Sequence, residues 1–260
     1  EAEKDQYGQT RVMMGLQDEL FHYPLKQQEE LIIPETILSC SREGFGQLSV
    51  QFHRCIRDHI CRGKYNKEVR PVLINSWEAA YFDFNGETIC KLAKEAAELG
   101  MDLVVMDDGW FGKREDDNSG LGDWQVNERK LGCSLGELIQ KIHGFGLKFG
   151  IWIEPEMVSE DSDFYRAHPD WVLQIPGRKP VYSRYQLVLD FSRKEVREAV
   201  FLQICQVLDQ GNVEYVKWDM NRSLAEAYSM EHNQGKVMYQ YVIGVYDFLE
   251  KMLKRYPQIL

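Results

Sequence analysis

Lys217 and Asp219 lie two positions apart in Tyr215–Asn221, a segment whose composition predicts a β-strand. Side chains two positions apart on a strand point to the same face, so the ammonium and the carboxylate are expected to lie together. A neighbouring ammonium favours the ionised carboxylate and lowers its pKa, which suits a nucleophile rather than a general acid. A buried structural salt bridge is the alternative that this strand alone leaves open.

A pair of carboxylates, Asp107 and Asp108, follows the apolar run Leu103–Met106 and precedes Gly109. Carboxylate oxygens at a strand end accept hydrogen bonds from sugar hydroxyls or bind a divalent metal. A metal site would need further ligands, yet the six histidines fall in expected helices, loops or the N-terminal segment. Metal binding is therefore the weaker interpretation and no cofactor is expected, while a helix cap or solvated turn stays open for the pair.

Three tryptophans, Trp77, Trp110 and Trp152, lie at or just beyond the ends of expected strands. An aromatic face stacks on the C–H surface of a pyranose ring, whereas a single buried tryptophan usually only packs. Three tryptophans beside acidic residues and long connections together favour a carbohydrate pocket.

The elements that must position these residues alternate from residue 70 onward between short apolar segments and longer helical patterns, which is typical of βαβ units and a parallel sheet. Two connections, residues 110–133 and 154–184, exceed the usual loop length and follow strands directly. In a (β/α)8 barrel, loops after strands line the active-site face. Strands are expected at residues 72–77, 102–107, 148–154, 186–191 and 214–219, with helices at 88–99 and 237–252 and capping boxes at Ser134–Glu137 and Ser192–Glu195.

The first 68 residues have a different pattern. Residues 30–39 resemble a strand, and residues 45–59 repeat apolar side chains at steps of three and four, which predicts an amphipathic helix. The charged stretch Arg62–Arg70, closing on Pro71, breaks both periods and is the expected domain boundary.

Composition narrows the partner classes. The 260 residues hold a formal net charge of −10, which argues against nucleic acid as a partner. No apolar stretch approaches the roughly 20 residues of a membrane helix, so no membrane partner is expected. Six scattered cysteines without a Cys-x-x-Cys pair indicate free thiols in a reducing compartment.

Five ordered motifs resemble those of family 36 α-galactosidases of the melibiase type. The resemblance implies an α/β chain in which residues 69–260 form the first part of a (β/α)8 barrel. Residues 1–68 would be the end of an N-terminal β-sandwich domain with a helical link. The motifs are Asn75–Phe84 (NSWEAAYFDF), Met106–Gly112 (MDDGWFG), Gly150–Met157 (GIWIEPEM), Ser183–Asp190 (SRYQLVLD) and Val216–Arg222 (VKWDMNR).

The resemblance also implies roles for individual residues. Asp219 would be the nucleophile that forms a galactosyl-enzyme intermediate, and Lys217 would bind the sugar while keeping Asp219 ionised. Asp107 and Asp108 would accept hydrogen bonds from galactose hydroxyls. Further residues implied at the site are Trp77 and Trp152 as pocket walls, Arg184 as a donor, Asn221 as a less certain contributor, and Glu154 and Glu156 as orienting residues.

One departure from the family pattern concerns the second catalytic carboxyl. A retaining glycosidase needs it about 5 to 5.5 Å from the nucleophile. In the resembled family it lies on a later barrel strand, beyond a glycine-rich stretch that this sequence does not contain. The chain is therefore expected to be a fragment with the nucleophile half of an active site, inactive alone. Bacterial relatives imply a cytoplasmic protein and a homotetramer at full length.

The expected reaction is retaining hydrolysis of terminal α-galactosyl units from melibiose, raffinose or stachyose. Alternatives are a family 31-like α-glucosidase or α-xylosidase, a raffinose synthase-like transglycosylase, an α-N-acetylgalactosaminidase, or a catalytically incomplete carbohydrate-binding protein. Family 31 typically has Glu after its Asp-Met-Asn strand, whereas this chain has Arg222.

Overall fold

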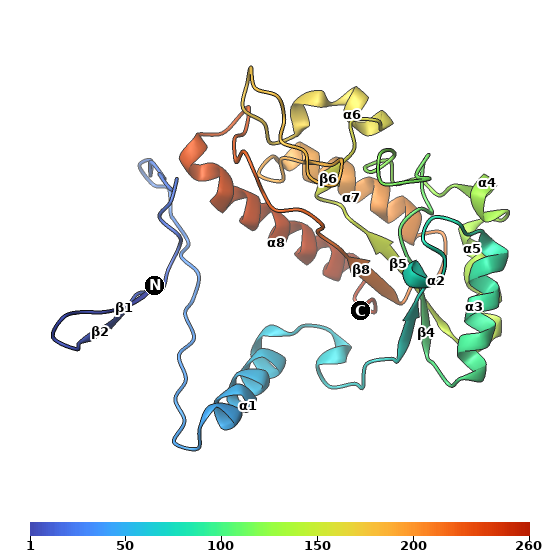
Figure 1. Cartoon of the computed structure of the whole chain (residues 1–260), viewed down its shortest axis with the longest axis horizontal. Coiled ribbons are helices and arrows are strands. Elements are labelled where there is room, and N and C mark those ends of the chain that lie inside the picture. Colours follow the sequence, from blue (N-terminus) through green and yellow to red (C-terminus); the bar gives the residue numbers. More distant parts are fainter.

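A parallel four-stranded sheet forms the centre of the computed structural model, which describes residues 1–260 (Figure 1). Its strands follow the order β3 (Leu73–Asn75), β4 (Leu103–Met106), β5 (Lys148–Ile153) and β8 (Tyr215–Trp218). Neighbouring strands pair in parallel, with Val105 opposite Gly150 and Trp152 opposite Lys217. The predicted α/β class and four of the five expected strands are thus confirmed.

Helices connect and cover these strands. Helix α3 (Gly86–Glu98) links β3 to β4, and α5 (Leu135–Gly144) links β4 to β5; the two helices contact each other. Helix α7 (Lys194–Leu208) precedes β8 and contacts α8 (Val237–Arg255), which follows it (Figure 1). Shorter helical elements are α2 (Trp77–Ala80), α4 (Glu128–Leu131), α6 (Asp163–Ala167), η2 (Lys64–Asn66), η3 (Pro169–Trp171) and η4 (Gln234–Lys236).

The core lies on both faces of the sheet. All four residues of β4 are buried, and β5 is buried from Phe149 to Ile153. Strands of parallel sheets are covered on both faces, which explains why these strands are apolar without alternation. Trp110, Phe111, Trp124 and Trp152 pack together within this core.

The predicted capping box at Ser134 is confirmed, because the Ser134 hydroxyl accepts from the Glu137 amide and Glu137 accepts in return from the Ser134 amide. The one predicted at Ser192 is wrong. Arg193 is the N-cap of α7 and makes no capping side-chain bond, while the Ser192 hydroxyl donates to Asp190. A nearby carboxylate has competed for the hydroxyl that would cap the helix.

The strand predicted at residues 186–191 is also wrong as a member of the main sheet. Only β7 (Leu187–Val188) forms, and it pairs antiparallel with β6 (Met157–Val158). The next two amides along the chain also bond outside the main sheet: Leu189 donates to the Glu156 carbonyl and Asp190 to the Trp171 carbonyl. A short apolar run shows that a segment is buried but not which strand it pairs with.

The N-terminal segment begins with an antiparallel hairpin of β1 (Ala2–Lys4) and β2 (Thr10–Val12) and continues to α1 (Phe45–Cys55) and the π-helical turn η1 (Ile56–Ile60). The strand expected at residues 30–39 does not form, since this stretch has no pairing partner and Pro34 lacks an amide donor. The helix predicted at 45–59 is confirmed.

This segment reaches the beginning of α8 (Figure 1). The His22 amide donates to the Gly235 carbonyl at 3.0 Å, and the Tyr239 hydroxyl donates to the Ile32 carbonyl at 2.7 Å. Lys236 pairs with Glu29 at 3.2 Å and lies over the Tyr23 ring.

At the other end of the chain, Leu260 pairs beside β8 by backbone hydrogen bonds to Glu214 and Val216. None of the helices combines the length and the hydropathy required to cross a membrane.

Candidate active site

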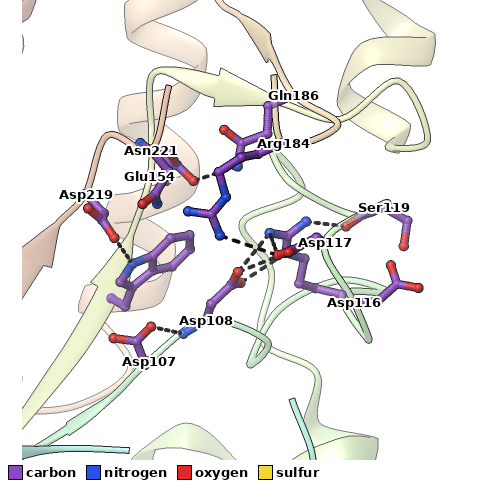
Figure 2. Close-up of polar contacts among 12 residues, drawn as sticks. Asp107, Asp108, Asp116, Asp117, Ser119, Glu154, Arg184, Gln186, Asp219 and Asn221 are labelled. Carbon is purple, nitrogen blue, oxygen red and sulfur yellow. Dashed lines mark hydrogen bonds and ion pairs between the residues drawn. The ribbon is translucent and has the colours of Figure 1, made fainter. Parts of the chain in front are cut away.

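All eight site residues predicted from the sequence line one pocket. Figure 2 labels Asp107, Asp108, Arg184, Asp219 and Asn221 among them. The carboxyl ends of parallel strands meet at one edge of a sheet, and ligands bind outside that edge. The pocket follows this rule. Most of its residues lie at or just after the ends of β3, β4, β5 and β8, and Arg184 lies in the turn before β7. The eight residues are Trp77, Asp107, Asp108, Trp152, Arg184, Lys217, Asp219 and Asn221.

Lys217 has a nearer partner than the one expected. Its ammonium lies 2.8 Å from Asp107 Oδ2 and 3.9 Å from Asp219 Oδ2. Asn75 also donates to Asp107 Oδ2, at 2.6 Å, and the Asp107 amide donates to the Ser76 hydroxyl. Lys217 therefore forms ion pairs with two carboxylates, Asp107 after β4 and Asp219 after β8, and not with Asp219 alone.

The Trp152 indole donates a hydrogen bond to Asp219 that the sequence did not predict. Its Nε1–H donates to Asp219 Oδ2 at 3.0 Å, and the Met220 amide donates to Oδ1 at 3.1 Å. Partial burial raises the pKa of Asp219, but hydrogen bonds from Trp152 and Asn221 and the charge of Lys217 outweigh it, so the pKa is lowered overall. The carboxylate is ionised near neutral pH while its side chain keeps 31% of its exposure.

We expect Trp152→Phe to raise the pKa of Asp219, because phenylalanine keeps an aromatic wall and removes the donor to the ionised form. The acidic limb of kcat/KM against pH reports essential groups of the free enzyme. It should move to higher pH in the full-length protein, while the basic limb stays in place. An acidic limb at the same pH as in the unsubstituted protein would contradict this role of Trp152.

Asp108 is held by Arg114, a residue that no sequence pattern predicted at the site. Arg114 Nε and Nη2 donate to the two Asp108 oxygens at 3.0 and 2.8 Å, and Nη1 donates to the Ser119 carbonyl. Both side chains are buried, with 1% exposure at Arg114 and 7% at Asp108. Burial raises the pKa of Asp108, although the Arg114 hydrogen bonds and charge oppose the rise.

Glu154 and Glu156 are buried behind the pocket and accept hydrogen bonds from residues around it. Glu154 accepts from the Asn221 amide at 2.6 Å and from the Gln186 side chain at 3.0 Å. Burial raises the pKa of Glu154, against these hydrogen bonds. Glu156 accepts from the Trp218 indole and the Tyr241 hydroxyl. Both carboxylates thus contact residues around the pocket, and their orienting role stays a prediction.

Of the three tryptophans, Trp77 and Trp152 line the pocket and Trp110 does not. Trp110 is fully buried, and its indole donates to the Trp152 carbonyl at 3.0 Å. Packing is thus the role of Trp110. It supports the strand that presents Trp152.

Arg184 enters the pocket from a tight turn. Arg184 and Tyr185 have φ of 52° and 57°, and the Gln186 amide donates to the Ser183 carbonyl, as in a type I′ turn. Arg222, also missed from the sequence, fixes the turn by donating to the Val181 and Gln186 carbonyls. Because Arg222 follows Asn221, the segment after β8 holds the loop that presents Arg184.

The pocket offers carboxylates, one ammonium, one guanidinium, one amide and two indoles. Such a set can bind hydroxyl groups on several sides and supply an ionised oxygen nucleophile. The structure contains no group of three or more His, Cys, Asp or Glu side chains arranged to hold a metal ion.

Comparison with curated proteins finds relatives over the whole chain. A bifunctional α-galactosidase/sucrose kinase, AgaSK, from Mediterraneibacter gnavus is 66% identical over 260 residues, which cover 100% of this chain and 27% of that protein. The α-galactosidase Mel36A from Lactobacillus acidophilus is 46% identical over 263 residues, covering 100% and 36%. The chain thus spans about a third of the length of these relatives.

Solved structures give the same result. The galactosidase domain of AgaSK superimposes with a TM-score of 0.95 at 66% identity, covering 100% of this chain and 35% of that one. A variant of the family 36 α-galactosidase AgaA from Geobacillus stearothermophilus, in complex with stachyose, gives a TM-score of 0.95 at 43% identity and covers 100% and 36%. The sequence model described as Melibiase matches residues 31–260. This chain therefore belongs to the melibiase family.

Proposed function

We propose that the protein containing this chain is a retaining α-galactosidase that hydrolyses terminal α-galactosyl units of oligosaccharides. The observation that supports this most strongly is the ionised and partly exposed Asp219 carboxylate, which lies in a pocket lined by groups that can bind hydroxyls. The family membership agrees, since relatives are named α-galactosidases and related structures hold stachyose or raffinose.

In the proposed mechanism, Asp219 attacks the anomeric carbon and forms a covalent galactosyl ester as the aglycone leaves. Water then attacks the anomeric carbon, the bond to the Asp219 oxygen breaks, and galactose is released with its original anomeric configuration while the Asp219 carboxylate is regenerated. Lys217, Asp107, Asp108, Arg184 and Asn221 bind the sugar hydroxyls, with Trp77 and Trp152 as walls. These bonds orient the anomeric carbon toward the Asp219 oxygen before the reaction.

The acid that protonates the leaving group must be a further carboxyl. Asp107 is already paired with Lys217, and Asp108 with Arg114, so neither is free to deliver and recover a proton. We propose that this group comes from a part of the protein outside these 260 residues, and that the chain alone is inactive.

The proposed architecture places residues 69–260 in the first part of a (β/α)8 barrel, after the end of a β-sandwich domain and a linking helix in residues 1–68. The parallel order of β3, β4, β5 and β8 supports it, as does the pairing of Leu260 beside β8. An apolar groove on that side, lined by side chains including Val216, Trp218 and Met252, suits packing of further elements. The full-length protein is proposed to be a cytoplasmic homotetramer.

The activity is tested on the full-length protein with three aryl glycosides. We expect kcat/KM for the α-galactoside to exceed that for the α-glucoside and the α-N-acetylgalactosaminide by at least about 10²-fold, since a site built to bind hydroxyls rejects a misplaced one. NMR should show α-galactose as the first product. Preference for the glucoside, or β-galactose as the first product, would overturn the proposal.

A further inference from the structure

Two charged side chains from separate long connections meet beside the pocket, as Figure 2 shows. Asp117 Oδ1, on the connection after β4, lies 3.8 Å from Arg184 Nη2, on the turn before β7. The same oxygen lies 3.7 Å from Arg114 Nη2. Asp117 itself is not among the residues that line the pocket.

The Arg114 side of this arrangement is rigid. The Arg114 guanidinium is buried, forms a two-point pair with Asp108 and donates to the Ser119 carbonyl. It also lies over the Phe82 ring. Asp117 therefore rests against a cation that cannot move away without exposing a buried carboxylate.

The Arg184 side is fixed only in its backbone. Arg222 and the side chain of Gln186 hold the turn from both ends. The Arg184 side chain keeps 44% of its exposure, and its pairing with Asp117 is the one polar contact that the structure gives it. An arginine side chain has many rotamers, so without Asp117 the guanidinium would spread over several positions.

We propose that Asp117 is a positioning residue that holds the Arg184 guanidinium toward the sugar site before substrate binds. The inference rests on the proposed function and adds a residue to it. Affinity falls in proportion to the fraction of the protein in the binding-competent state, so loss of Asp117 weakens substrate binding. It leaves the reaction at Asp219 unchanged once the sugar is bound, because the substrate then orders Arg184.

This role differs from a structural one in what it predicts. Asp117 and Arg184 are both over two-fifths exposed, and pairs of this kind contribute little to stability. Thermal stability should therefore be unaffected by substitution of Asp117. The attraction should also be sensitive to salt, because the Debye length shrinks to about 3 Å at 1 M ionic strength.

The test compares Asp117→Asn with Asp116→Asn in the full-length protein, using an aryl α-galactoside. Asp116 is the matched control, since it is a neighbouring exposed carboxylate that accepts from the Asn118 amide and makes no contact with Arg184. We expect Asp117→Asn to raise KM about three- to tenfold with kcat within about twofold and an unchanged Tm. Asp116→Asn should change none of the three. Asp117→Glu, which keeps the charge, should recover part of the loss.

A double-variant cycle with Arg184→Gln isolates the coupling. Asp117→Asn should have no further effect on KM in the Arg184→Gln background, and 1 M salt should narrow the gap between Asp117→Asn and the unsubstituted protein. Additive effects in the cycle, a fall in kcat at constant KM, or a loss of Tm would overturn the inference. If the unsubstituted protein does not hydrolyse the aryl α-galactoside, the proposed function itself fails. This outcome is distinct from every outcome above, because those compare variants with an active unsubstituted protein.

Discussion

Replacement of Asp219 by glycine in the full-length protein is expected to lower kcat for an aryl α-galactoside by at least about 10⁴-fold, which corresponds to about 5.5 kcal/mol of transition-state free energy. Without the carboxylate no covalent ester forms, while the other groups that line the pocket stay in place. Asp219→Asn should be nearly as inactive, because the amide is a poor nucleophile although it fills the same space.

Chemical rescue separates a lost nucleophile from a damaged pocket. In Asp219→Gly, azide can enter the vacated space and attack the anomeric carbon of an activated aryl α-galactoside from the side that Asp219 occupied. We expect activity to return with azide and the product to be β-galactosyl azide, identified by NMR. Asp116→Asn, on the exposed surface, is the control that should keep full activity without azide. Full turnover of Asp219→Asn, or rescue that gives the α-azide, would exclude Asp219 as the nucleophile.

Strand periodicity and strand ends were sufficient to group part of this pocket, whereas the resemblance to family 36 α-galactosidases implied Arg184 and Asn221. Lys217 lies on β8 and Asp219 directly follows it, while Asp107 follows the buried run of β4. Strand ends in a parallel sheet meet at one edge, so these residues were expected to lie together. The sequence did not show which oxygen Lys217 reaches. Its pairing with Asp107 depends on the order of β4, β5 and β8, which is a property of the whole sheet.

The arginines behind the pocket could not be found in this way. Arg114 and Arg222 lie in connections without periodicity, and their partners are Asp108 and the carbonyls of Val181 and Gln186. The same limit explains two of the three incorrect predictions. The hydroxyl of Ser192 and the apolar run around Leu187 each had a second partner available, which only the folded chain selects. The one signal for Arg114 in the sequence was its own positive charge, six positions after Asp108.

Removal of Arg114 should have the largest effect on stability. In Arg114→Met the apolar side chain roughly fills the space, but Asp108 is left as a buried carboxylate without its partner. Breaking a buried pair in this way typically costs about 3 to 5 kcal/mol. We expect the free energy of unfolding at pH 7 to fall by that amount, measured by urea unfolding of the full-length protein with tryptophan fluorescence.

The pH dependence of this loss follows from the raised pKa of Asp108. A carboxyl whose pKa is higher in the folded than in the unfolded protein binds a proton more readily when folded, so its cost to stability is relieved as the pH falls through the folded pKa towards the ordinary value of 3.8. Removal of the Arg114 charge raises the pKa of Asp108 further. The difference between Arg114→Met and the unsubstituted protein should therefore grow as the pH rises and shrink as it falls.

The double variant Arg114→Met/Asp108→Asn distinguishes an unpaired charge from a packing defect. Its neutral amide needs no cation, so it should recover most of the stability that Arg114→Met loses and should remove the added pH dependence. Asp108→Asn alone retains the Arg114 guanidinium without a carboxylate and should itself be destabilised. A double variant as unstable as Arg114→Met would mean that the Arg114 side chain acts through its packing against Phe82 and its bond to Ser119, and not by neutralising Asp108. Substrate binding should stay impaired in the stable double variant, because it lacks the Asp108 carboxylate proposed to bind a sugar hydroxyl and the Arg114 cation against which Asp117 holds Arg184.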